Sequence, residues 1–187
     1  MGNCMSAEHR RATADRGGHA RSGSDSRALG SDSRVLDCTD VPPLAELEGF
    51  VPPLRVGKVV KVYDGDTLTV GAPLHLDGAR RFYKFSVRLR GIDCPELRSR
   101  NDTEKQVAAI ARDELRSLVL DKVVHLGDVG LDKYGRVLAT VSLGGQDMSA
   151  HLLTKRLAVP YRGRTKTRVK NWHTFYTTGT DAGGDSP

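Results

Sequence analysis

The sequence contains few cysteines and no long apolar run. Three cysteines occur in 187 residues, namely Cys4, Cys38 and Cys94, and they lie far apart. An odd and scattered set argues against a disulfide framework and a zinc site, and it fits a reducing compartment. No run of 18 apolar residues and no signal-peptide core is present, so the sequence predicts neither a transmembrane helix nor secretion. We therefore expect an intracellular protein.

The beginning of the chain also lacks any hydrophobic period. Its central stretch, GGHARSGSDSRALGSDSR, is rich in Gly, Ser, Arg and Asp, and such a segment cannot bury enough apolar surface to offset its chain entropy. Residues 1–50 hold six Lys/Arg and eight Asp/Glu, so the net charge of +6 comes from the remainder, with 23 basic and 15 acidic residues. We expect a disordered leader over residues 1–45, followed by a basic folded part.

The first six residues, MGNCMS, match the pattern for N-myristoylation on Gly2. Cys4 stands where a palmitoyl group would supply the second anchor that stable membrane binding requires. Two interpretations stay open. Acylation predicts the cytoplasmic face of the plasma membrane, with the inner membrane surface as a partner, whereas a chance match predicts a cytoplasmic protein. A mitochondrial transit peptide is disfavoured because acids interrupt the Arg/Ser stretch.

Alternating and helical patterns begin near residue 50. Five short strands with one helix after the third predict an α+β fold, mainly β, namely a five-stranded Greek-key barrel of the OB-fold class with two or three helices. Thr103 and Gln106 have the spacing of a capping box at the start of the first helix. We expect this domain over residues 50–165. The strands are expected at 55–63, 66–71, 81–90, 122–129 and 136–143, and the helices at 102–120 and 148–158.

A basic and aromatic tail, residues 166–187, is expected after the domain. From Lys155 to Lys170 there are seven basic residues and no acid, and Trp172, Phe175 and Tyr176 follow. Two interpretations are open for this region. It could contact a nucleic-acid backbone and stack on its bases, or it could be a solvated tail whose aromatic side chains cover the core.

Three short motifs place acids and arginines close to strand ends. Asp66 follows the hairpin turn in YDGDT, where a turn alone needs no second acid. Asp93 and Glu96 lie in IDCPE, where the proline ends the strand. Arg88 precedes that motif, on the strand face opposite the buried one, and Arg136 opens the strand after DKYG. These five side chains are therefore candidates for one site.

The residue types in this set suit phosphate chemistry. Two carboxylates and a backbone carbonyl make an incomplete oxygen cage, which a hard cation such as Ca²⁺ accepts while keeping positions for water and a phosphate oxygen. A third carboxylate can orient or deprotonate that water. Two arginines can hold a phosphate whose charge grows in the transition state. The implied chemistry is metal-assisted phosphodiester hydrolysis.

The motifs YDGDT, RLRGIDCPE and DKYGR, in this order, make the chain strongly resemble the thermonuclease (staphylococcal nuclease-like) family from about residue 54 to about residue 161. The resemblance implies that Ca²⁺ is bound by Asp66, Asp93 and the backbone carbonyl of Cys94. It further implies that Arg88, Glu96 and Arg136 are catalytic and that Lys133, Tyr134 and Tyr161 bind the nucleotide. A free thiol at Cys94 leads to the hypothesis that activity is sensitive to oxidation.

The resemblance implies a Ca²⁺-dependent endonuclease that hydrolyses DNA and RNA with little sequence preference. Single-stranded or frayed nucleic acid is the favoured substrate, and no obligate protein partner is implied. The alternative is a catalytically inactive OB-type module that binds nucleic acid or peptide. Because both metal carboxylates, Glu96 and both arginines are present, the sequence favours the enzyme.

Overall fold

A computed structural model describes residues 41–76, 78–164 and 167–180. The chain divides into two units, Met1–Leu47 and Glu48–Pro187. In the first unit, the described residues contain the 3₁₀ turn η1 (Leu44–Glu46). Gly2 and Cys4, whose acylation stays a prediction, lie outside the described residues. None of the helices within the described ranges has the length and apolar character needed to cross a bilayer.

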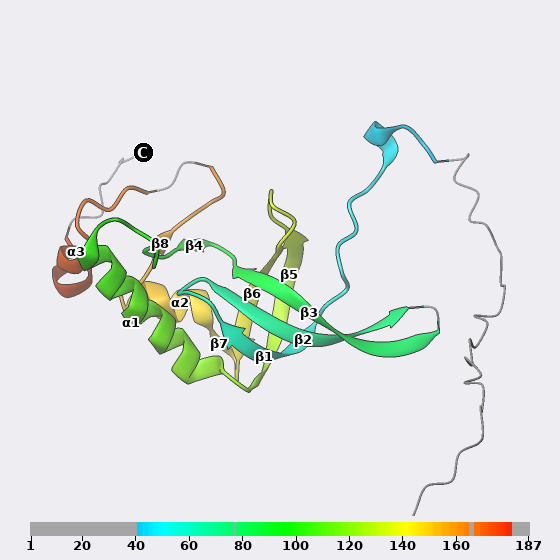
Figure 1. Ribbon diagram of the computed structural model, residues 1–187, viewed down its shortest axis with the longest axis horizontal. Coiled ribbons are helices and arrows are strands. Elements are labelled where there is room, and N and C mark those ends of the chain that lie inside the picture. Colours follow the sequence, from blue (N-terminus) through cyan, green and yellow to red (C-terminus); the bar gives the residue numbers. More distant parts are fainter. Residues whose placement is uncertain (1–40, 77, 165–166, 181–187) are drawn as a thin grey trace, which may run out of the picture. The chain divides into compact units, whose positions relative to one another are not determined.

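The second unit contains a closed barrel of five strands, β1 (Val56–Val62), β2 (Thr67–Leu76), β3 (Ala79–Leu89), β5 (Val123–Leu131) and β6 (Val137–Leu143). Their order is β3-β2-β1-β5-β6, with antiparallel neighbours, and a parallel pairing of β3 with β6 closes the barrel (Figure 1). The predicted fold class is therefore confirmed. The short strand β4 (Ile92–Asp93) pairs with β8 (Val159–Pro160), and β7 (Gln146–Asp147) pairs with the end of β6.

Strict alternation of side chains gives the barrel its core. Leu68 and Val70 of β2 and Val87 and Leu89 of β3 are fully buried, and the registers Leu68↔Val87 and Val70↔Phe85 put these positions on one face. The other face of the same two strands carries Arg88. The strand β2 is five residues longer at its end than the predicted 66–71, because the alternation continues past Pro73.

In the part of the chain that the structure describes, three α-helices accompany the barrel, α1 (Asp102–Val119), α2 (Met148–Thr154) and α3 (Trp172–Thr178). The expected cap at Thr103 is wrong. Asn101 caps α1, because its Oδ1 accepts hydrogen bonds from the backbone N–H groups of Thr103 and Glu104. The buried side of α1 is an apolar stripe that includes Val107, Ala111 and Leu115.

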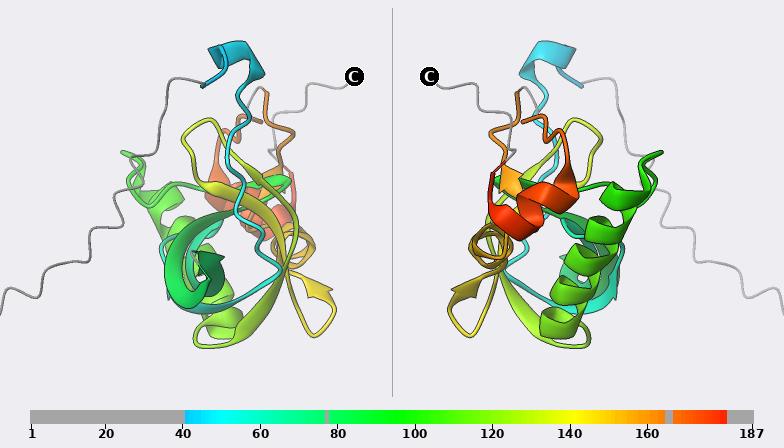
Figure 2. Two further views of the ribbon diagram at one scale, coloured as in Figure 1. Left: turned by 90° about the vertical axis from the view of Figure 1, so that its right-hand side faces the viewer. Right: turned by 90° about the vertical axis from the view of Figure 1, so that its left-hand side faces the viewer.

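The aromatic residues near the C-terminus belong to the core. Trp172 at the start of α3 is 7% exposed and packs edge to face on Phe175, with ring centroids 5.8 Å apart. Tyr176 is partly buried against the same core. The helix α3 lies beside α1 (Figure 2). This packing favours the interpretation in which the aromatic side chains cover the core.

Candidate nuclease site

One pocket of about 760 Å³ gathers residues from four parts of the barrel domain. These parts are the β1–β2 turn, the end of β3 with the segment through β4, the β5–β6 turn, and the segment after β8. All nine site residues predicted from the sequence line this pocket, namely Asp66, Arg88, Asp93, Cys94, Glu96, Lys133, Tyr134, Arg136 and Tyr161. The role of each is a proposal that rests on this proximity.

Asp66 is held in place by the turn that contains it. Its backbone N–H donates to Asp64 Oδ1 at 3.3 Å, and the Thr67 hydroxyl donates to Asp66 Oδ1 at 2.9 Å. Its carbonyl accepts a hydrogen bond from the backbone N–H of Leu89 at 2.8 Å, which ties the turn to β3. The residue is 4% exposed. The hairpin end thus fixes a carboxylate inside the pocket.

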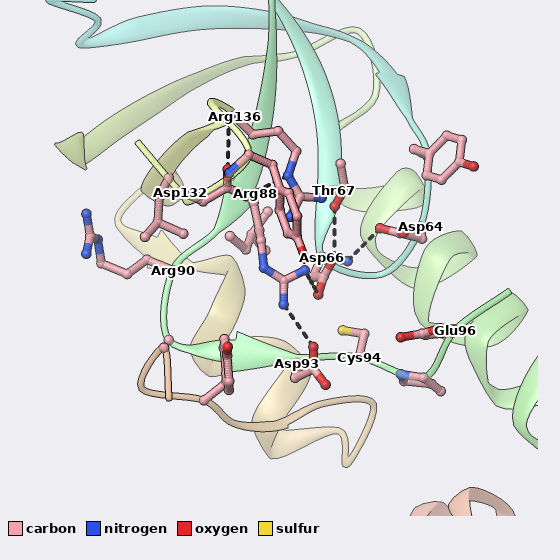
Figure 3. Close-up of a pocket in the computed structure, with 18 of the residues that line it drawn as sticks. Asp64, Asp66, Thr67, Arg88, Arg90, Asp93, Cys94, Glu96, Asp132 and Arg136 are labelled. Atoms are coloured by element: carbon pink, nitrogen blue, oxygen red, sulfur yellow. Dashed lines mark hydrogen bonds and ion pairs between the residues drawn. The ribbon is translucent and has the colours of Figure 1, made fainter. Parts of the chain in front are cut away.

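The guanidinium of Arg88 lies between the carboxylates of Asp66 and Asp93, the two residues expected to bind the metal (Figure 3). Its Nη1 is 2.5 Å from Asp66 Oδ2, and its Nη2 is 2.9 Å from Asp93 Oδ1. The same Nη2 donates to the Ile92 carbonyl at 3.3 Å. One side chain therefore contacts the β1–β2 turn and β4 together.

Burial dominates the electrostatics of this cluster. Removal from water raises the pKa of Asp66 to about 6, although the charge of Arg88 opposes the rise. Burial would lower the pKa of Arg88, but the charges of Asp66 and Asp93 outweigh it and raise that pKa above its ordinary value. The charge of Arg88 therefore offsets only part of the cost of burying the Asp66 carboxylate. A further cation nearby would favour the ionised form of Asp66.

The donor set fits Ca²⁺. Asp66 and Asp93 both reach one guanidinium, so their oxygens lie close together, and carboxylate oxygens are the ligands that a hard cation prefers. Across the described residues, no group of three His, Cys, Asp or Glu side chains forms a fuller set. The remaining positions would fall to a carbonyl such as that of Cys94, to water and to a phosphate oxygen.

The thiol of Cys94 packs inward. The residue is 5% exposed, and its Sγ lies where it would be only 2.9 Å from a Cβ placed on Gly65. Burial, together with the nearby charge of Asp66, raises the pKa of the Cys94 thiol well above its ordinary value. Because oxidation proceeds through an accessible thiolate, this environment argues against the hypothesis of oxidation sensitivity.

Glu96 lies on the exposed segment after β4, and α1 positions that segment. Glu104, in the first turn of α1, accepts the backbone N–H of Glu96 at 3.1 Å and the hydroxyl of Ser99 at 2.6 Å. Glu104 is not among the residues predicted from the motifs. Its partners lie outside its own helix, so no helical periodicity points to it.

Asp132 holds the second arginine and is likewise absent from the predicted set. Its Oδ2 is 2.6 Å from Arg136 Nε, and its Oδ1 accepts the backbone N–H groups of Tyr134 and Arg136 at 2.8 and 2.9 Å. Burial would raise the pKa of Asp132, but the hydrogen bonds from Arg136 and Tyr134 outweigh it and lower that pKa. An Asp that opens a turn, as in DKYG, was the available signal.

Aromatic rings stand beside cations around the pocket. Tyr134 is 72% exposed, and the Lys133 ammonium and the Arg136 guanidinium lie 4.9 and 5.5 Å from its ring centroid. Arg88 lies 5.9 Å from the ring centroid of Tyr161. Tyr63, the first residue of the YDGDT motif but not among the predicted site residues, also lines the pocket. Exposed rings next to cations can stack on bases while the cations contact phosphate.

Two relatives share sequence with part of this chain. A protein named probable endonuclease LCL3 from Kluyveromyces lactis is 31% identical over 104 residues, covering 53% of this chain and 38% of that protein. A protein of the same name from Nakaseomyces delphensis is 28% identical over 111 residues, covering 57% of this chain and 43% of that protein. The chain thus spans less than half the length of these relatives.

A family-level comparison matches the later part of the domain. The family described as staphylococcal nuclease homologue matches residues 86–183, which include β4, the helices α1, α2 and α3, and eight of the nine predicted site residues. Asp66 precedes the matched region, and the β2–β3 pairing brings it beside Arg88. Because the match covers more than half of the chain and the closed barrel agrees with it, the chain belongs to the staphylococcal nuclease homologue family.

Proposed function

We propose that this chain is a Ca²⁺-dependent endonuclease that hydrolyses the phosphodiester bonds of DNA and RNA with little sequence preference. One observation carries the proposal. Two nearly buried carboxylates, Asp66 and Asp93, share the guanidinium of Arg88 in a pocket that also holds Glu96 and Arg136. Acidic groups for a cation and basic groups for a phosphate thus occur side by side.

Arg88 and Arg136 would bind the phosphate. A guanidinium offers paired N–H donors that match phosphate oxygens, and such donors stabilise charge that grows in the transition state. Arg136 is oriented by Asp132, which leaves part of its fork for a ligand. Arg88 is oriented by the two carboxylates. Both donors are therefore positioned before substrate binds, which lowers the cost of reorganisation.

Glu96 would orient the attacking water and accept its proton. A general base must reach water and keep its carboxylate oriented. The residue is exposed at the pocket, and Glu104 holds its backbone. A shift of the Glu96 segment would therefore change the rate of hydrolysis more than the affinity for nucleic acid.

Asp66, Asp93 and the Cys94 carbonyl would hold Ca²⁺. When bound, the cation would polarise the scissile phosphate and offset its negative charge. Lys133, Tyr134 and Tyr161 would contact the nucleotide, with the rings stacking on bases and the ammonium meeting phosphate. Contacts of this kind tolerate any base, which is consistent with weak sequence preference.

The test is cleavage of single-stranded DNA, duplex DNA and RNA in Ca²⁺, in Mg²⁺ and in chelator. We expect cleavage in Ca²⁺ that chelator abolishes, and a loss of about 10²-fold or more in Glu96→Gln. Glu48→Gln is the matched control, because Glu48 is exposed and lies outside the pocket. Nucleic-acid binding without cleavage under any metal would reject the enzyme and favour the inactive binding module.

A further inference from the structure

The β2–β3 hairpin extends beyond the strand that supports its base. The two strands pair continuously from Thr67↔Arg88 to Leu76↔Ala79. The neighbouring strand β1 pairs with β2 only as far as Gly71. The outer half of the hairpin, residues 72–76 and 79–83, therefore has no β1 neighbour and projects from the barrel (Figure 1).

One face of β3 runs from this projection into the pocket. Because side chains alternate along a strand, Arg80, Phe82, Lys84, Ser86 and Arg88 share a face. The first four are exposed, and the last lies in the pocket. From Arg80 to Arg88, the strand covers about 26 Å at ~3.3 Å per residue. A polymer bound at Arg88 can therefore continue along this face.

The exposed part of the face carries an aromatic ring between two cations. Phe82 is 71% exposed, and the Arg80 guanidinium lies 5.2 Å from its ring centroid. Lys84 is the next residue on the same face. We call Arg80, Phe82 and Lys84 the hairpin surface. Exposed rings interleaved with cations are the combination that binds single-stranded nucleic acid, through stacking and phosphate contacts.

The surrounding strands add positive charge. Strands β1, β2 and β3 contain six Lys/Arg and no Asp or Glu. One acid of the connecting turn, Asp77, lies outside the described residues. Among the described residues, Lys58 of β1 forms an ion pair with Asp121, and both side chains are more than half exposed. The hairpin therefore presents a field that attracts a polyanion.

We propose that the hairpin surface binds the part of a nucleic-acid strand that extends out of the pocket, so that affinity increases with substrate length. This inference rests on the proposed function. An anionic membrane would also meet cations and an exposed Phe. Nucleic acid is favoured because the face continues along one strand into the pocket, a course that a linear polymer can follow and a membrane plane cannot.

The test compares a triple variant, Arg80→Ala, Phe82→Ala and Lys84→Ala, with the control Arg116→Ala and Lys122→Ala. The control removes the same charge from two exposed residues outside the pocket. Binding of labelled single strands of about 4 and about 16 nucleotides, spanning the range of OB-fold site sizes, is measured in chelator by fluorescence anisotropy at several salt concentrations. The whole chain of 187 residues is used.

We expect the triple variant to bind the 16-mer about tenfold more weakly and the 4-mer equally well. A plot of the logarithm of the binding constant against the logarithm of the salt concentration should have a slope less negative by about 1.4, because two phosphate contacts are lost and each contributes about 0.7. The control should bind both strands like the unchanged chain. Cleavage of the 4-mer in Ca²⁺ should be unchanged in the triple variant.

Unchanged binding of the 16-mer, or an equal loss in the control, would overturn the inference. So would loss of binding to phosphatidylserine vesicles with intact 16-mer binding, which would assign the surface to a membrane. The single variant Phe82→Ala, at an exposed position, tests stacking if the triple variant unfolds. Binding is read in chelator, so absence of cleavage by the unchanged chain would reject the nuclease and leave the length-dependent binding to be judged separately.

Discussion

The Asp66 carboxylate has an environment that suits a ligand better than a structural group. It is nearly buried, and the Arg88 guanidinium compensates only part of the lost hydration, so its pKa rises to about 6 from an ordinary 3.8. A carboxylate with this pKa is destabilising in its charged form unless another cation binds. Such a conflict between stability and charge is typical of functional sites.

Asp66→Asn should flatten the pH dependence of stability in chelator. Below pH 3.8 the group is protonated in both states. Between pH 3.8 and about 6 Asp66 ionises in the unfolded chain before it ionises in the folded one, so the free energy of unfolding falls as pH rises. Above pH 6 this loss of free energy stays constant, and it amounts to about 3 kcal/mol at most. The variant should therefore be at least as stable as the unchanged chain at pH 7, although inactive.

Urea unfolding from pH 4 to pH 8 would measure this effect. Asp121→Asn is the control, because Asp121 is an exposed acid with a left-handed backbone that Asn also accepts. If Asp66→Asn is less stable than the unchanged chain at pH 7, and its free energy of unfolding changes with pH at the same rate, then the Asp66 carboxylate does not destabilise the fold.

Asp132→Asn should separate the fold of the β5–β6 turn from the orientation of Arg136. The amide oxygen of Asn can still accept the two backbone N–H groups that Asp132 Oδ1 accepts, but its amide nitrogen cannot accept from Arg136 Nε. We expect kcat to fall about 10- to 100-fold, because the guanidinium is no longer held in place, with little change in melting temperature. Steady-state kinetics and thermal unfolding would show it, and unchanged kcat would remove Asp132 from the positioning of Arg136.

At the scale of elements, the β1–β2 turn lies directly against α1. A Cβ placed on Gly65 would be 2.8 Å from the Cβ of Ala111 and 2.9 Å from Cys94 Sγ. Only glycine lets the turn, the helix and the segment after β4 approach this closely. The glycine next to Asp66 thus has a packing role as well as a turn role.

Gly65→Ala should destabilise the domain by about 1–3 kcal/mol, because the added methyl must displace well-packed atoms. Gly71→Ala is the matched control within the same sheet, since its Cβ would meet no atom closer than 3.8 Å. Chemical denaturation of both variants, with the Ala111→Gly background as a double-mutant cycle, would test the contact. Equal stability of the two variants would contradict it.

Alternation made most of the barrel predictable from the sequence. Val87 and Leu89 pointed to the buried face of β3, and the opposite face was correctly expected to carry Arg88. The motifs likewise pointed to residues that share one pocket. In contrast, the cap at Asn101 was missed, because several residues near a helix start can accept the same N–H groups and only the backbone conformation decides between them.

Features that depend on contacts between residues distant in the sequence could not be predicted. Glu104 and Asp132 act through backbone N–H groups of loops, which leave no periodic signal. The short helix α3 carries one fully packed side chain, Trp172, so it has too few apolar positions to form a recognisable stripe. Its packing depends on the barrel as a whole and could not be inferred from residues 172–178 alone.

On the scale of the whole molecule, positive charge and the pocket are arranged for a polyanion. The residues from 51 onward carry 23 basic and 15 acidic groups, and the acid-free strands β1–β3 run toward the pocket that holds the two metal-candidate carboxylates. A long-range positive field increases the rate at which a polyanion is encountered. The buried acids then supply the local negative charge that a cation needs.

Calcium binding should stabilise the whole domain even when no reaction occurs. A ligand that binds only the folded state at 100 times its Kd adds about 2.7 kcal/mol, which for this size corresponds to roughly 5–10 °C in melting temperature. Because Arg88 already pairs with both carboxylates, Ca²⁺ must compete with it, and we expect weak affinity, with Kd on the order of 10⁻⁴–10⁻³ M.

The shift in melting temperature should disappear in Asp66→Asn and persist in Glu96→Gln, because only the first variant removes a ligand. Thermal unfolding at increasing Ca²⁺ would measure it. An equal shift in Asp66→Asn would place the cation elsewhere, and loss of the shift in Glu96→Gln would make Glu96 a ligand rather than the group that activates water.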